Sequence, residues 1–143
     1  MIRSFRPVLL VSLFLTMSAC ASVPADLDLT LKHPTDHQAF VVELEPPATP
    51  PAVNKIHSWQ IRVADSKGAP VRNARIAVDG GMPQHGHGFP TQPRVTREVG
   101  EGVYLLEGMK FNMTGWWEIR LRLDAQQESD TVTFNTVLGS SAH

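Results

Sequence analysis

Cysteine is nearly absent from this sequence, because Cys20 is the only one among 143 residues. No disulfide can form within one chain, so the fold depends on its hydrophobic core, which a domain of about 100 residues can supply. A large charge of one sign is also absent, since 13 basic residues face 14 acidic residues. Nucleic-acid-binding proteins usually carry a basic patch or stripe, so we expect no nucleic-acid partner.

Catalytic signatures are missing as well. The sequence has no nucleophile elbow, no phosphate-binding glycine loop and no second cysteine. Serine, histidine and aspartate residues occur without a spacing that links them, and no carboxylate pair lies in an apolar setting. We therefore expect a protein that is not an enzyme.

Residues 1–20 have the pattern of a secretory signal. Arg3 and Arg6 precede an apolar run at residues 8–15, which is too short to span a bilayer comfortably. The mature protein is therefore expected outside the cytosol.

Small residues stand directly before Cys20, as in a bacterial lipobox, whose cysteine is lipidated and becomes the mature N-terminus. The usual leucine three positions before the cysteine is Met17 here. Ala21 rather than aspartate follows, which by resemblance to Gram-negative sorting rules favours the outer membrane. We expect a periplasm-facing lipoprotein anchored through Cys20; an ordinary A-x-A cleavage site at residues 19–21 is the alternative.

The mature chain is predicted to be all-β. Residues 21–38 are polar and lack a period, which is typical of a flexible tether, and residues 139–143 form a C-terminal tail. Between them, residues 39–138 contain short alternating runs separated by turn signals, with no helical period. Strands are expected at residues 39–45, 56–64, 72–78, 94–99, 103–109, 116–124 and 131–138. About seven such strands favour an antiparallel β-sandwich of the immunoglobulin-like type.

The stretch from Gly80 to Gly88 combines two histidines and a methionine with four glycines and a proline. Because glycine permits positive φ and proline disfavours helix, we expect a shaped turn that is neither helix nor regular strand. Side chains two positions apart share one side of an extended chain, so His85 and His87 project together.

Methionines on two connections complete a candidate metal site. Met82 reaches the histidines if the turn folds back, and Met113 lies on a later connection between strands. If both connections lie at the same end of the sandwich, Met82, His85, His87 and Met113 converge. Thioethers favour Cu(I) and imidazoles accept either oxidation state, so this set predicts copper binding.

Structural interpretations compete with this one. Methionine often fills gaps in a core, and Met109 has the parity of a core residue. His57 alternates with Trp59, which favours packing, and Pro34 argues against a helical metal pair of His33 and His37. In the alternative hypothesis, the His-Gly-His turn is only a connection in a structural or interaction module of the envelope that binds no metal.

Three motifs carry a family resemblance: Gly-Met-Pro-x-His-Gly-His-Gly at 81–88, Gly-x-Tyr at 102–104 and Gly-Met-x-Phe-x-Met-x-Gly-x-Trp at 108–117. They resemble the YtkA-like domain family, related to the FixH type, over roughly residues 56–137. Thr114 stands where family members often have proline. The resemblance implies an immunoglobulin-like β-sandwich with a role in copper handling and cytochrome oxidase assembly. A copper-accepting envelope protein or an oxidase assembly factor is then the expected partner.

Overall fold

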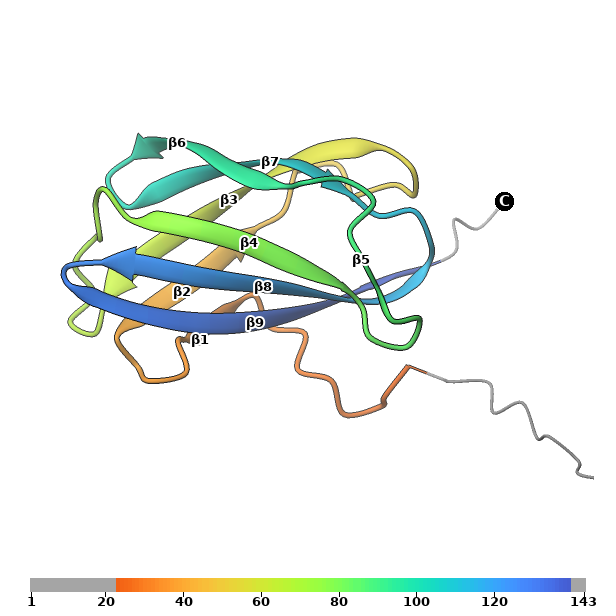
Figure 1. The fold of residues 1–143 in the computed structure, drawn as a ribbon, viewed down its shortest axis with the longest axis horizontal. Helices are drawn as coiled ribbons and strands as arrows, with labels where there is room; N and C mark the ends of the chain where they lie inside the picture. Colours follow the sequence, from red (N-terminus) through yellow and green to blue (C-terminus); the bar gives the residue numbers. More distant parts are fainter. Residues whose placement is uncertain (1–22, 140–143) are drawn as a thin grey trace, which may run out of the picture.

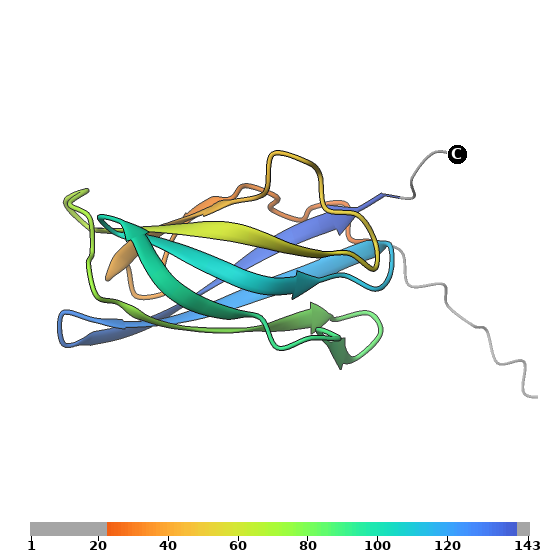
Figure 2. The same cartoon turned by 90° about the horizontal axis from the view of Figure 1, so that it is seen from above.

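The computed structural model describes residues 23–139, in which nine strands form two antiparallel sheets packed face to face (Figures 1 and 2). One sheet has the order β1 (Lys32–Pro34), β2 (Phe40–Glu45), β3 (Ile56–Asp65), β7 (Val103–Lys110) and β6 (Arg94–Gly100). The other has the order β5 (His87–Gly88), β4 (Arg75–Met82), β8 (Gly115–Ala125) and β9 (Glu128–Leu138). The predicted all-β sandwich is confirmed, and each of the seven expected strands is present.

Two further strands bring the described total to nine, and both lie where the sequence indicated none. β1 falls inside the predicted tether at residues 21–38, where Lys32 pairs with Glu43 of β2 and the Thr35 side chain is buried. β5 falls inside the predicted turn and pairs with the end of β4. Strands of two or three residues are too short for an alternating pattern to reveal.

β4 also runs further than expected, to Met82 instead of residue 78. Gly80 and Gly81 suggested a break, but here they permit close approach between neighbouring segments. A Cβ on Gly81 would lie 2.2 Å from the carbonyl oxygen of His87, and one on Gly80 would lie 2.1 Å from that of Glu118. The glycines therefore keep the strand regular and let its neighbours close on it.

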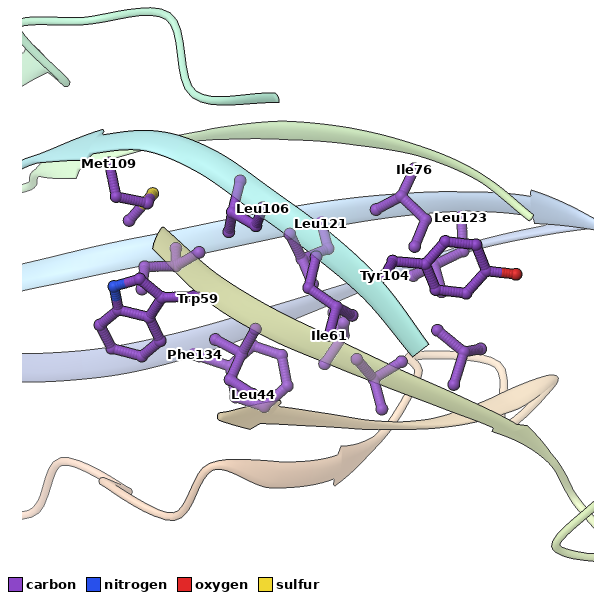
Figure 3. Packing of buried hydrophobic residues seen from close by; sticks show 14 of the residues in the cluster. Leu44, Trp59, Ile61, Ile76, Tyr104, Leu106, Met109, Leu121, Leu123 and Phe134 are labelled. Atoms are coloured by element: carbon purple, nitrogen blue, oxygen red, sulfur yellow. The ribbon is translucent and has the colours of Figure 1, made fainter. Parts of the chain in front are cut away.

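The core fills the space between the two sheets (Figure 3). The alternating strand residues predicted to face inward do so: Ile61, Leu106, Leu121 and Phe134 are at most 1% exposed. Full burial of one such side chain contributes roughly 1.5–3 kcal/mol. Hydrophobic burial of this kind, contributed by strands of both sheets, holds together a domain that has no disulfide.

The sandwich has two ends with different loops (Figure 1). We call "loop end" the end formed by the β4–β5 turn at 83–86 and the β7–β8 connection at 111–114. We call "hairpin end" the opposite one, formed by the β8–β9 turn at 126–127 and the β1–β2 turn at 35–39. Residues 23–139 contain no helix that is long and apolar enough to cross a membrane. The predicted signal with Cys20, and residues 140–143 of the predicted tail, lie outside the described residues.

Candidate functional site

The β4–β5 turn places a methionine beside a histidine. The backbone N–H groups of His85 and Gly86 both donate to the carbonyl oxygen of Met82, at 3.1 and 3.0 Å, and Gly86 has φ +65°. The chain then reverses, so that Met82 and His87 are directly opposed across the two strands. Directly opposed side chains share one face and have Cβ atoms about 4.5–5.5 Å apart. The turn thus folds back as the metal-site prediction requires.

The two histidines of the turn contact each other. The ring centroids of His85 and His87 are 5.8 Å apart with an angle of 28° between the planes, and both residues are exposed. A metal about 2.0 Å from one nitrogen of each ring lies roughly 3 Å from each centroid, so two ligating rings stand at most about 6 Å apart. The observed spacing of 5.8 Å lies just inside this limit.

A backbone contact also orients the second ring. Nδ1 of His87 lies 3.2 Å from the carbonyl oxygen of Gly88. In the tautomer that donates from Nδ1, the lone pair of Nε2 is free for a metal. Metal-ligating histidines commonly donate their other ring nitrogen to a carbonyl in this way.

Trp117 connects the two loops. Its ring centroid lies 5.9 Å from that of His87, and its indole N–H donates to the carbonyl oxygen of Met113 at 3.1 Å. The methionine connection therefore lies at the same end as the histidine turn. This is the arrangement on which the predicted convergence depends.

The two methionines differ in exposure. Met82 is 1% exposed, and a Cβ placed on Gly115 would lie 3.2 Å from its Cε. Met113 is 39% exposed. One thioether thus lies beneath the histidine turn, and the other belongs to the surface of the connection.

Aromatic rings form a floor below this group. Trp117 is fully buried, stacks on Phe89 at 5.7 Å with 5° between the planes, and meets the edge of Phe111 at 5.2 Å. A groove of about 390 Å³ borders the turn and is lined by residues that include His87, Glu118 and Arg120. Across residues 23–139, no three His, Cys, Asp or Glu side chains gather as a metal-binding group. Met82 and Met113 are the thioether donors that the predicted ligand set adds to the two histidines.

The other described histidines make their contacts outside this group. His37 contacts Asp130 at the hairpin end, with Nδ1 2.9 Å from Oδ1, and His33 packs on Phe134 with centroids 5.0 Å apart. His57 packs against Phe111 at 5.1 Å, as its alternation with Trp59 predicts. His143 lies outside the described residues.

Two contributors to the loop end were not found from the sequence. Phe89 stands between Gly88 and Pro90, outside any alternating run, so no period indicates its stacking on Trp117. Asn112 lies in the β7–β8 connection, and its Oδ1 is buried. The sequence marks Asn112 only as the first residue of an Asn-x-Thr sequon, which does not indicate burial.

Comparisons with known proteins give one family and one structural neighbour. Residues 34–122 match the family described as YtkA-like. No curated protein matches the chain. A solved structure of the ZirS C-terminal domain is similar at 14% sequence identity and a TM-score of 0.44, over 93% of this chain and 83% of that one.

Proposed function

The chain belongs to the YtkA-like family, and on that premise we propose that it is a lipid-anchored envelope protein that binds copper and delivers it to a partner without catalysing a reaction. Cys20 carries the lipid, and the domain faces the periplasm, with the outer membrane favoured. His85 and His87 supply nitrogen ligands, and Met82 and Met113 supply thioether ligands.

The meeting of the two loops at Trp117 is the observation that carries this proposal. One indole contacts the ring of His87 and the backbone of Met113, although these residues are 26 positions apart in the sequence. Met82 opposes His87 across the β4–β5 pair. Four side chains that suit copper thus belong to one end of the sandwich.

The ligand types and their exposure support transfer rather than storage. A mixed set of imidazoles and thioethers accommodates both oxidation states of copper without a thiolate. Both histidines are exposed, so an acceptor protein has direct access to the ion. A copper-accepting envelope protein or an oxidase assembly factor fits this role.

Copper titration of the full-length protein in detergent micelles tests the proposal. We expect one Cu(I) per chain to bind with a submicromolar dissociation constant, and Cu(II) to quench the fluorescence of Trp117, whose ring contacts His87. The double substitution His85→Ala/His87→Ala should abolish both signals. Met113→Leu should weaken Cu(I) binding by about tenfold and Cu(II) binding less, because thioethers prefer the softer ion.

His33→Ala is the matched control, because His33 packs on Phe134 and lies outside the proposed ligand set. It should leave binding and quenching unchanged. If the protein binds no copper, or if the double variant binds as tightly as the original, the metal proposal fails. The histidine turn is then a connection within an interaction module of the envelope.

A further inference from the structure

The tautomer of His57 is determined by a neighbour. The indole N–H of Trp59 lies 2.9 Å from Nδ1 of His57 and donates to it. Indole nitrogen is only a donor, so Nδ1 must be the acceptor. Burial lowers the pKa of His57 from its ordinary value. The ring is therefore neutral near pH 7, with its hydrogen on Nε2.

That hydrogen has no acceptor within the described part of the chain. Nε2 of His57 is buried, and no residue from 23 to 139 makes a hydrogen bond to it. An unsatisfied buried donor destabilises the fold. Such groups in folded proteins commonly mark a bound water or ion.

An unsatisfied acceptor lies in the β7–β8 connection, next to the phenylalanine that His57 contacts. Oδ1 of Asn112 is the other buried side-chain atom without a partner among residues 23–139. Asn112 directly follows Phe111, whose ring packs on His57, and the N–H of Asn54 donates to the carbonyl oxygen of Phe111 at 2.7 Å. One atom thus belongs to a side chain that packs on Phe111, and the other to the residue that follows Phe111 at the loop end.

A copper ion is the wrong occupant for His57. Met109 opposes His57 across β3 and β7, so the pair superficially repeats Met82 and His87 (Met109 is labelled in Figure 3). Ligation through Nε2, however, requires the hydrogen to move to Nδ1, where it would face the N–H of Trp59. Two donors then point at each other, which disfavours a metal here.

We propose that one water molecule binds inside the loop end, accepting a hydrogen bond from Nε2–H of His57 and donating one to Oδ1 of Asn112. A water that makes both bonds joins heavy atoms about 5–6 Å apart, and it needs two to four polar partners. The bridge fixes the 111–114 connection, which carries Met113. This positioning role rests on the proposed copper site. Through the bridge, His57 and Asn112 act as positioning residues for the proposed ligand Met113.

A double-mutant cycle in the full-length protein tests the bridge. The unfolding equilibrium constant is measured for the original protein, Asn112→Leu, His57→Phe and the double variant. If one water joins both side chains, Asn112→Leu should change this constant at least fivefold more in the original protein than in His57→Phe. Additivity within about twofold means that the two sites are independent and overturns the proposal.

Nuclear magnetic resonance gives an answer that does not depend on the variants folding. Long-range nitrogen–proton spectra should show His57 as the Nε2–H tautomer, and its ring protons should cross-relax with a long-lived water. Detection of the Nδ1–H tautomer, or the absence of cross-relaxation with water, overturns the proposal.

Copper binding then separates this inference from the proposed function. Asn112→Leu should weaken Cu(I) binding by roughly tenfold, the scale typical of lost outer-shell support. His33→Ala should not. If the original protein binds no copper, the proposed function fails, but the cycle and the resonance spectra still decide whether the water is present. If copper binds and Asn112→Leu leaves its affinity unchanged, the positioning role is wrong.

Discussion

At the hairpin end, the side chain of Asp130 is 0% exposed and accepts hydrogen bonds from the backbone N–H groups of His37, Ala39 and Thr131. At the loop end, by contrast, buried atoms of His57 and Asn112 have no partner among residues 23–139. The same sandwich therefore satisfies a buried charge completely at one end and leaves neutral polar groups unsatisfied at the other.

The pKa of Asp130 reflects the hydrogen bonds that its carboxylate accepts at the hairpin end. Burial alone would raise this pKa, but hydrogen bonds from Thr35, His37, Thr131 and Ala39 outweigh burial and hold it well below its ordinary value. The carboxylate thereby ties the β1–β2 turn to β9. The buried charge at the hairpin end is paired within its own chain, whereas the loop end has exposed histidines and buried polar atoms without a partner among residues 23–139.

Asp130→Asn should have the largest effect on stability, and its structural effect should be confined to the hairpin end. The amide keeps the shape but removes the charge that three backbone donors require, so we expect a loss of about 3 kcal/mol in the free energy of unfolding. Chemical denaturation at neutral pH measures this loss. Copper affinity of the folded protein should not change; a tenfold loss would mean that the two ends are coupled.

Asp124→Asn is the control, because Asp124 lies on the partly exposed β8 side of the same hairpin. It should lower the free energy of unfolding by less than about 0.5 kcal/mol.

Gly80→Ala should disturb the packing of the loop end, with a smaller loss of stability than Asp130→Asn. An added Cβ would lie 2.1 Å from the carbonyl oxygen of Glu118 and 2.7 Å from Cε2 of Phe89, so the strand pair and the ring stacked on Trp117 must shift. We expect a loss of about 2 kcal/mol in the free energy of unfolding and weaker copper binding.

Gly86→Ala is the control for that substitution. No atom lies within 4 Å of its added Cβ, so only the positive φ of +65° is penalised, at about 1 kcal/mol. Equal stability losses for the two alanine variants would show that close approach at Gly80 is unimportant.

The sequence predicts those features of the fold that depend on neighbouring residues, and it misses those that depend on residues distant along the chain. Alternation along residues 116–124 predicts a half-buried strand, because side-chain period is a property of the strand itself. The extension of β4 to Met82 was not predicted, since Gly80 and Gly81 act through neighbours that are distant in sequence.

The candidate site divides in the same way. The spacing of His85 and His87 indicates that the two rings share one side, and their centroids are 5.8 Å apart. The stacking of Phe89 on Trp117 and the unsatisfied Oδ1 of Asn112 arise from tertiary contacts that leave no pattern in the sequence. Whether these residues bind copper remains a prediction.

His37→Ala should have the smallest effect on stability. Its pH dependence distinguishes the two ends of the sandwich, because His37 has a carboxylate partner whereas His85 and His87 contact each other. The hydrogen bond to Asp130, with its negative charge, raises the pKa of His37. Since the folded-state pKa is the higher one, the stabilisation is complete below the unfolded value of about 6.5 and is lost as pH rises through the folded value. Denaturation curves should therefore show a larger penalty for His37→Ala at roughly pH 5 than at pH 8.5. In an Asp130→Asn background this difference should shrink to the small part due to the charge of Asp36. A larger penalty at the higher pH would contradict the assigned partner.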